Sequence, residues 1–465
     1  MKKAITMLAI IVLLLSIALI GCSKESAGEN DSGVVNQEQN NGESVNTETE
    51  AELPEDDEQE EVTIRLASWD TGETYKARIA AFEEAFPHIK VEHDESITWP
   101  WNEALAASAA AGTLPDVLWF FTAPTAYQHE WAADLTPFLE LDPEYDQNNI
   151  FGTLVEETNY NGVQVALPHS LNVQGVLLNL DLFEKENKEV PSYDWTLDSA
   201  RELARAMTKA NDDQYGFQNV KGARDMLFGQ FDPAQGWATY DGEKFNFDSR
   251  AFIDTINTIQ DIVDREKIDV GSLTEEERKT IYGEDIDPFI SGKVAMKFDA
   301  TWAFGGVTEN AEFKWDFYPY PKVNAQRPPM IADYLGISST SKHKEAAFEF
   351  VKFMTYSKEG WLKRIELENP MGSIPIINDS DVWEAYLSAD YVPEGMKQMI
   401  PLLSDGFVDP LKTSPGYAPG MEASLWGEGN GPDLDSGTVR PEDVGPVWQE
   451  LANKAAEEAF EEMNK

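Results

Sequence analysis

The sequence predicts an α/β fold, in which strands and helices alternate along the chain. Two observations support this prediction. Residues 62–93 have the pattern of a strand, a helix and a second strand within about 30 residues, which is typical of a parallel βαβ unit. After this unit, short apolar runs typical of buried strands alternate with segments of helical periodicity. The length of 465 residues allows two or three domains of ordinary size.

The first elements follow from local patterns. Residues 62–66 alternate between apolar and polar side chains, as a half-buried strand does. Apolar residues between positions 75 and 86 recur at helical spacing, and Pro87 ends that helix. Residues 89–93 alternate again, so a second strand follows.

Later elements are predicted from the same two periodicities. The apolar runs at 116–121 and 175–183 predict buried strands. Helical patterns are predicted at 196–210, 248–264, 343–356 and 444–463.

The N-terminus has the organisation of a secretory signal. A basic start at Lys2 and Lys3 precedes an apolar run over 7–20, and the chain's single cysteine, Cys22, follows Gly21. The ending Leu-Ile-Gly-Cys at 19–22 resembles the lipobox of bacterial lipoproteins, which implies a signal peptide over 1–21 and acylation of Cys22. The alternative is a plain signal peptide or anchor helix in which the cysteine has no role. One cysteine also excludes an intrachain disulfide, a multi-thiolate zinc site and a CxxC redox pair.

Residues 22–61 predict an acidic, disordered tether. They contain 14 acidic residues against the single base Lys24, and no aromatic residue. Such a composition cannot bury enough apolar surface to fold, so we expect it to hold a folded module above a membrane.

The charge balance excludes several classes of partner. The chain has 36 Lys and Arg against 84 Asp and Glu, giving a formal net charge of -48. Nucleic-acid binding depends on cationic contacts to phosphates, so no nucleic-acid partner is expected. Adhesion to anionic lipid is disfavoured for the same reason, which leaves the N-terminal lipid as the only expected membrane contact.

Searches for catalytic motifs predict that the protein is not an enzyme. No Gly-x-Ser-x-Gly is present, Gly292-Lys293 lacks the upstream glycine of a P-loop, and the five histidines form neither HxH nor HExxH. Paired carboxylates for glycoside chemistry carry no specificity in a chain with 84 acids. We therefore expect no catalytic residue, no cofactor and no metal.

Six segments in order resemble the bacterial extracellular solute-binding proteins of the family-1 type, which serve carbohydrate ABC importers. They are FEEAFPHIKVEHDE (82–95), AASAAAGTLPDVLWF with ADLTPFLEL (106–141), NGVQVALPHSLNVQGVLLNLDLFEK (161–185), FISGKVAMKFDATWAF (289–304), LGISSTSKHKEAAFEFVKFMTYSKEG (335–360) and GSIPI (372–376). Two positions depart from the family's pattern. Leu178 stands where tyrosine is common, and Asp299 stands where glycine is frequent.

The resemblance implies a two-lobed fold of the type II periplasmic-binding-protein kind, with a ligand cleft between lobes joined by a hinge. One lobe would comprise 62–170 and 336–372, and the other 171–335 and 373–465. The implied function is that of a lipid-anchored substrate-binding component of an ABC importer, at the extracellular face of the cell membrane. It would capture a carbohydrate, with an oligosaccharide as the expected ligand, by hinge closure and deliver it to a permease; we expect a monomer. The alternatives are a cell-surface glycoside hydrolase or lyase, and a binding protein for a solute other than sugar.

A sugar presents hydroxyls to polar side chains and apolar ring faces to aromatic ones, and loops after strands line such sites in α/β folds. Candidate ligand residues in predicted loops and strand ends are Trp69, Asp70, Phe120, Phe121, Asn172, Gln174, Asp299, Trp302, Tyr334 and Tyr417. Trp302 matches a ligand-stacking position of the family, and Tyr417 approximately matches a late stacking aromatic. For Phe120 and Phe121 the alternative is a place in the core, and for Asn172 and Gln174 it is the capping of a turn.

For three further residues, a structural role is weighed against ligand contact. Arg224 is expected to be an ion-pair partner in this acid-rich chain rather than a ligand clamp. Trp99 and Trp101, in the distinctive TWPWNEAL segment, are expected to pack the edge of a lobe or to contact ligand.

Overall fold

The computed structural model describes residues 60–369 and 371–465. The signal peptide over 1–21, Cys22 and nearly all of the tether over 22–61 therefore lie outside the described residues. By their contacts, residues 59–465 form one compact unit. Within the described part of the chain, no helix combines the length and the apolar character that crossing a bilayer requires.

The predicted βαβ unit is confirmed. Strand β1 (Val62–Ala67) is followed by helix α1 (Glu73–Ala85) and strand β2 (Ile89–His93). The two strands are parallel, in register from Val62 opposite Ile89 to Leu66 opposite His93. Phe82 lies on the buried face of α1.

The other strands are β3 (Val117–Phe120), β4 (Asn159–Tyr160), β5 (Val163–Gln164), β6 (Leu167–Asn179), β7 (Tyr215–Gln218), β8 (Val294–Ala300), β9 (Trp315–Tyr318), β10 (Pro329–Ile337) and β11 (Phe407–Val408). The other α-helices are α2 (Trp101–Ala111), α3 (Ala123–Gln128), α4 (Thr136–Leu141), α5 (Leu180–Lys185), α6 (Leu197–Met207), α7 (Arg224–Phe231), α8 (Arg250–Gln260), α9 (Glu275–Tyr282), α10 (Phe304–Asn310), α11 (Lys344–Thr355), α12 (Lys358–Leu367), α13 (Ser380–Ser388), α14 (Glu394–Met399), α15 (Tyr417–Glu422), α16 (Asn430–Asp435) and α17 (Pro441–Met463).

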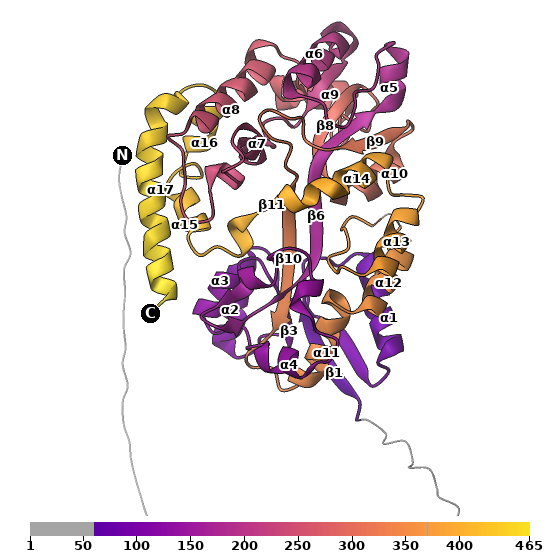
Figure 1. The fold of residues 1–465 in the computed structure, drawn as a ribbon, viewed down its shortest axis with the longest axis vertical. Helices are drawn as coiled ribbons and strands as arrows, with labels where there is room; N and C mark the ends of the chain where they lie inside the picture. Colours follow the sequence, from indigo (N-terminus) through magenta and orange to yellow (C-terminus); the bar gives the residue numbers. More distant parts are fainter. Residues whose placement is uncertain (1–59, 370) are drawn as a thin grey trace, which may run out of the picture. The chain divides into compact units, whose positions relative to one another are not determined.

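One mixed sheet of nine strands organises the described residues. Its order is β2-β1-β3-β10-β6-β8-β7, with β11 paired to β10 and β9 paired to β6. Strands β1, β2 and β3 are parallel to one another, as are β7 and β8, whereas β10 is antiparallel to both β3 and β6. Strands β6 and β10 run side by side along the middle of the molecule (Figure 1). The α/β class is thus confirmed, with antiparallel central strands in place of a wholly parallel sheet.

Four predicted helices are present. Helices α6, α8, α11 and α17 correspond to the patterns at 196–210, 248–264, 343–356 and 444–463. Helix α8 continues as a single π-helical stretch over Asp261–Arg265.

The strand predicted at 175–183 differs from the structure at both ends. Strand β6 begins at Leu167 and ends at Asn179, and residues 180–185 form helix α5. The Asn179 side chain accepts a hydrogen bond from the backbone N–H of Leu182, so it caps this helix. A continuous apolar run is compatible with a strand or a buried helix, and this asparagine cap decides where one becomes the other.

Contacts divide most elements into two groups, which meet at β6 and β10. Helices α1 and α11–α13 pack near β1–β3, and α5, α6 and α14 pack near β7–β9. The predicted boundary between the lobes at 372–373 lies in a segment that contacts the first group. Phe151 donates its backbone N–H to the carbonyl of Ile376, and α13 packs on α12. The chain reaches the second group at α14, where Gly395 donates its N–H to Asp316. The lobe boundaries themselves stay a prediction.

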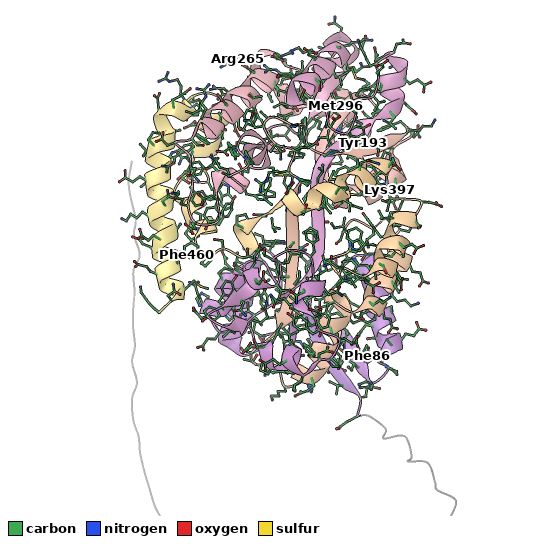
Figure 2. All side chains as sticks on the ribbon, viewed as in Figure 1. Phe86, Tyr193, Arg265, Met296, Lys397 and Phe460 are labelled. Carbon is green, nitrogen blue, oxygen red and sulfur yellow. The ribbon has the colours of Figure 1, made fainter. Side chains whose placement is uncertain are left out.

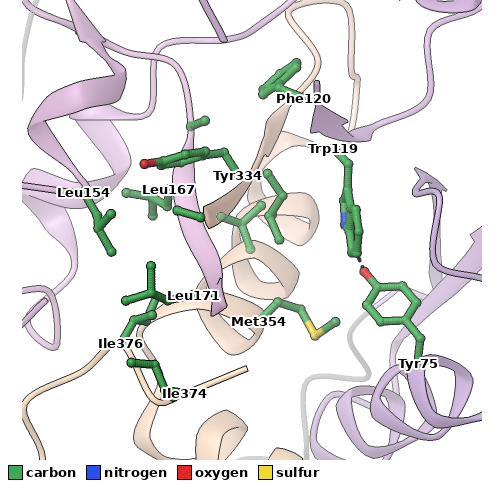
Figure 3. Packing of buried hydrophobic residues seen from close by; sticks show 14 of the residues in the cluster. Tyr75, Trp119, Phe120, Leu154, Leu167, Leu171, Tyr334, Met354, Ile374 and Ile376 are labelled. Atoms are coloured by element: carbon green, nitrogen blue, oxygen red, sulfur yellow. Dashed lines mark hydrogen bonds between the residues drawn. The ribbon is translucent and has the colours of Figure 1, made fainter. Parts of the chain in front are cut away.

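Side chains of the sheet and helices form extensive buried clusters. In Figure 2, Met296 lies within the fold on β8, whereas Arg265 and Lys397 project from the surface. Figure 3 shows part of the largest cluster, where Tyr334 packs near Leu154 and Leu167.

Candidate functional site

The centre of the candidate site is the paired stretch of β6 and β10. Ser170 lies opposite Asp333, and Asn172 lies two residues further along β6, opposite Ile331. Because alternate residues of a strand point to the same face, Ser170, Asn172 and Asp333 share one face of the strand pair. The Ser170 hydroxyl donates a hydrogen bond to an Asp333 carboxylate oxygen at 2.7 Å. Lys412, from the short helix Pro410–Lys412, forms an ion pair with the same carboxylate.

Asp333 carries its charge in a buried position because of these partners. Burial opposes ionisation, but the charge of Lys412 and the hydrogen bonds from Lys412 and Ser170 outweigh it and lower the pKa of Asp333. His169 is buried against Trp119, and burial holds the pKa of its imidazole well below the ordinary value. The centre of the site therefore holds one compensated ion pair beside a neutral imidazole.

The first side of the site is an aromatic group that we call the Trp69 cluster: Trp69, Trp99, Trp101 and Trp119. Trp69 contacts the other three indoles, with centroid distances of 6.1, 5.2 and 4.7 Å respectively. The Lys412 ammonium lies 5.3 Å from the Trp69 ring centroid, so a cation–π contact joins this cluster to the Asp333 pair. Trp69 is half-buried and already has partners on most sides.

A pocket of about 500 Å³ opens beside the Trp69 cluster. It lies at the carboxyl ends of β1 and β2, and its lining includes Trp69, Asp70 and Trp99. Asp70 is exposed, and one of its carboxylate oxygens accepts the backbone N–H of Gly72 at 3.0 Å. This pocket brings together two predicted ligand residues.

The second side of the site is the Trp302 segment, which we define as Lys297, Asp299 and Trp302. The indole of Trp302 is 50% exposed, and its N–H donates to an Asp299 carboxylate oxygen at 2.9 Å. The other Asp299 oxygen lies 2.6 Å from the Lys297 ammonium, which also pairs with Asp287 at 2.6 Å. Burial disfavours the charged lysine, but the two carboxylates outweigh it and raise the pKa of Lys297. Asp299 therefore orients the ring of Trp302.

The Trp302 segment joins the central strands through Thr301. Val173 donates its backbone N–H to the Thr301 hydroxyl at 3.2 Å, and that hydroxyl lies 3.5 Å from the Asn172 amide oxygen. Both sides of the site thus adjoin the same stretch of β6, at Ser170 and at Asn172. Asn172 and Gln174 lie inside this strand rather than in a loop before it, so neither caps a turn; Gln174 is buried and Asn172 half-buried.

Three predicted aromatic residues are enclosed by protein in this structure. Phe120 and Tyr334 are each 1% exposed and lie opposite each other on β3 and β10 (Figure 3). Tyr417 is 2% exposed and stacks on Phe245 at 5.6 Å between centroids. Their rings present almost no surface to a ligand here, so the site proposal below does not rest on them.

Phe121 is half-buried and lines a second pocket, of about 430 Å³. Residues from the α2–α3 region form one part of this pocket, and residues near α15 and α17, including Leu411 and Trp426, form the other. Segments far apart in sequence therefore meet at this pocket.

The remaining candidates have structural roles. Arg224 pairs with Asp225 at 2.9 Å and with Asp435 at 2.8 Å, in agreement with its interpretation as an ion-pair partner. Trp101 is buried and donates its indole N–H to the carbonyl of Trp119 at 2.9 Å. Within residues 60–369 and 371–465, no group of three or more His, Cys, Asp or Glu side chains is arranged to hold a metal ion.

Sequence reasoning did not single out Ser170, Asp333 or Lys412 at the centre of the site. Asp333 precedes the predicted Tyr334, and strand alternation places these two side chains on opposite faces. Alternation along β10 is therefore the signal that could have found Asp333. Lys412 has no comparable local signal, because its partner lies 79 positions away.

Comparison with known proteins agrees with this architecture. A family model described as "Bacterial extracellular solute-binding protein" matches residues 67–360, more than half of the chain. An ABC substrate-binding protein from Listeria monocytogenes in complex with cycloalternan is 20% identical, with a TM-score of 0.69 over 85% of this chain and 99% of that chain.

Two other solved structures have the same fold. The GacH receptor of Streptomyces glaucescens, solved unliganded and with acarbose, is 19% identical, with a TM-score of 0.63 over 87% of this chain and 98% of that one. The maltose/maltodextrin-binding domain MalE from Bdellovibrio bacteriovorus, bound to maltotriose, is 18% identical, with a TM-score of 0.62 over 86% and 100%. The fold is thus the mixed α/β periplasmic-binding-protein fold, and the chain belongs to the bacterial extracellular solute-binding proteins, a family of binding proteins and not of enzymes.

Proposed function

We propose that this protein is the substrate-binding component of a carbohydrate ABC importer and that its ligand is an oligosaccharide. The observation that carries this proposal is the half-exposed Trp302 ring, oriented by Asp299 beside the polar centre of the site. An indole face binds the apolar face of a sugar ring, and neighbouring polar groups bind its hydroxyls. The solved relatives with this fold include complexes with cycloalternan, acarbose and maltotriose, which supports the same ligand class here.

Capture would proceed by closure of the two predicted lobes over the ligand. A ligand that contacts both the Trp69 cluster and the Trp302 segment would bind the closed arrangement of the lobes more tightly than the open one. This difference in affinity would shift the protein toward the closed arrangement. Strands β6 and β10 pass between the two groups of elements, so bending within them is the expected hinge motion. The closed complex would then dock on a membrane permease, with the binding protein acting as a monomer.

The test of the ligand class is a thermal-shift screen against gluco-, xylo- and galacto-oligosaccharides, followed by calorimetry on Trp302→Ala. A specific ligand raises the melting temperature with its concentration. If Trp302 is a stacking residue, its truncation should cost about 2–4 kcal/mol of binding, or roughly thirty- to a thousand-fold in affinity.

The same Trp302→Ala sample is unfolded in denaturant as a control. Because the ring is half-exposed, the midpoint should change little. Retained affinity together with a large loss of midpoint would contradict the stacking role. A screen in which only non-sugar solutes stabilise the protein would support a binding protein for another solute class.

We also propose that Cys22 is acylated and anchors the mature chain at the extracellular face of the membrane, with 22–61 as tether. The support is the position of the only cysteine directly after the apolar run of the signal peptide. Cys22→Ala should release the protein to the medium or leave it unprocessed, as fractionation and mass spectrometry of the N-terminus would detect. Material that is processed at the same bond and stays acylated would contradict the anchor.

A further inference from the structure

We propose that Glu157, in a pocket behind the strand pair β6 and β10, couples closure of the candidate site to the release of a proton. The inference rests on the proposed function and on its hinge motion. It gives Glu157 a regulatory role without any contact to the ligand, and it makes the affinity for sugar depend on pH.

Glu157 lies on the face of the strand pair opposite the candidate site. Asp333 and Tyr334 are consecutive residues of β10, so their side chains point to opposite faces. Asp333 faces the site, where Ser170 donates to it. Tyr334 packs near Leu154 on the other face (Figure 3), and its hydroxyl donates to a Glu157 carboxylate oxygen at 3.4 Å. The strands that are expected to bend therefore separate Glu157 from the site.

A pocket of about 380 Å³, which we call the Glu157 pocket, is lined by residues from both groups of elements. Glu157 lies just before β4, and the hairpin formed by β4 and β5 is joined to the first group by a hydrogen bond from Asn161 to Tyr127 of α3. Trp237 lines the same pocket and follows α7, which shares a buried cluster with Phe217 of β7 in the second group. The width of the pocket therefore depends on how the two groups are arranged.

Bending within β6 and β10 has opposite effects on their two faces. When it brings the Trp69 cluster and the Trp302 segment closer together on one face, it separates the walls of the Glu157 pocket on the other. The closed arrangement therefore has the wider Glu157 pocket, whichever arrangement is the starting point. Water reaches the carboxyl group of Glu157 more freely in the wider pocket.

The hydrogen bonds to Glu157 come from hydroxyl groups. Thr153 donates at 2.9 Å and Thr413 at 3.5 Å, in addition to Tyr334. Burial disfavours the charged carboxylate and, with the nearby charge of Glu156, raises the pKa of Glu157 despite these bonds. Hydration in the wider pocket would return this pKa toward the ordinary glutamate value of about 4.3. Ionised Glu157 therefore favours the closed arrangement.

The charged and titratable groups around Glu157 are Glu156, Tyr160, Tyr240, Asp241, Arg327 and Tyr334. Burial raises the pKa of the three tyrosines, so they stay neutral. Glu156 is exposed in any arrangement of the groups.

The two remaining groups keep their charges. Arg327 stays cationic and donates to backbone carbonyls, among them that of Asp405 at 2.8 Å. Burial opposes ionisation of Asp241, but hydrogen bonds from the Lys244 backbone and the Asn246 side chain outweigh it and lower its pKa. Glu157 is therefore the group of this pocket whose charge follows the width of the pocket.

The sign of the coupling follows from linkage. The closed arrangement holds fewer protons on Glu157, so sugar affinity should rise with pH between the ordinary glutamate value and the raised one. Above the raised value the affinity should be constant. By reciprocity, sugar binding within this interval should release a proton from Glu157 to the buffer.

The experiment is calorimetric titration of the wild type and Glu157→Gln between about pH 5 and about pH 8. The probe is the gluco-, xylo- or galacto-oligosaccharide that the thermal-shift screen identifies. Buffers of different ionisation enthalpy count the protons released. The wild-type affinity should rise by at least about threefold over this range, with proton release at its acidic end. Glu157→Gln should lose both effects and bind at least about threefold more weakly than the wild type at pH 8, because a neutral amide does not favour the wider pocket.

Asp269→Asn is the matched control. Burial raises the pKa of Asp269 to about 6, but its carboxylate accepts the backbone N–H of Val220 within the second group. Hinge closure leaves these surroundings unchanged, so this variant should keep the wild-type pH dependence of sugar affinity.

Proton counting on the wild type tests the coupling even if Glu157→Gln folds poorly. Wild-type binding with neither pH dependence nor proton release would overturn the coupling and leave the proposed function standing. So would a pH dependence that persists in Glu157→Gln, because another group would then carry it. A screen in which no oligosaccharide binds at all would overturn the proposed function and the coupling with it.

Discussion

The Trp69 cluster and the Trp302 segment orient their tryptophans by different forces. Trp69 and Trp99 are held by ring contacts with a buried neighbour, Trp101, that belongs to the hydrophobic core. Trp302 has no such backing in its segment; its indole is oriented by Asp299, which Lys297 holds in turn. Aromatic packing is short-ranged and insensitive to salt, whereas the Lys297–Asp299 pair depends on charge. Substitutions in the packing of the first side should therefore affect stability, and substitutions behind Trp302 should affect ligand affinity as well as stability.

The largest expected effect comes from Trp101→Ala. This removes a buried indole together with its hydrogen bond to the Trp119 carbonyl, so the free energy of unfolding should fall by about 3–5 kcal/mol. Denaturant titration measures it.

A loss of less than about 1 kcal/mol would show that the first side does not depend on packing, and the contrast between the sides would fail. Leu141→Ala is the control, because Leu141 is exposed on the surface and its truncation should be nearly neutral.

The second effect concerns the ion pair that joins the Trp69 cluster to the central strands. Lys412→Met leaves the buried Asp333 carboxylate without its cation, which should cost about 2–4 kcal/mol of stability at neutral pH. Lys397→Met, in the exposed pair with Glu394, is the matched control and should change stability by less than about 1 kcal/mol.

The same pair predicts a pH dependence. The pKa of Asp333 is lowered in the folded protein, so its stabilising contribution is complete above the ordinary carboxyl value of about 3.9 and is lost as the pH falls through the folded pKa. Without Lys412, burial would raise that pKa instead. The stability difference between the wild type and Lys412→Met should therefore be greatest near neutral pH and narrow toward pH 4. A difference independent of pH would contradict the charge argument.

The third substitution lies behind Trp302. Lys297→Met removes the cation from a carboxylate about as buried as Asp333, so it should also cost about 2–4 kcal/mol of stability. In addition it should weaken ligand binding by about tenfold, because Asp299 no longer holds the indole in one orientation. Lys293→Met is the control. Lys293 directly precedes β8, the strand that carries Lys297, and forms a half-exposed pair with Asp213. Unchanged affinity with Lys297→Met would mean that packing alone orients Trp302.

Local periodicity in the sequence was sufficient to predict most of the fold, but it could not predict parts of the candidate site. The βαβ unit at 62–93 and helices such as α11 follow from spacing between near neighbours, so the sequence predicts them directly. Asn172 and Gln174 were expected in a loop because the long strand β6 begins earlier than its apolar run indicates. The exposures of Tyr417 and Trp302 differ although both are aromatic residues near strand or loop ends, and no local pattern separates them.

By itself, the sequence determined the α/β class, the order of most elements, the family resemblance and the choice of Trp302 as a candidate. Only the tertiary structure decided that Lys412 meets Asp333, that Asp299 serves to orient an indole, and that Trp99 rather than Trp69 presents its ring. The physical reason is range. Secondary structure depends on side chains three or four positions apart, whereas burial and ion pairing depend on which distant segments the folded chain brings together.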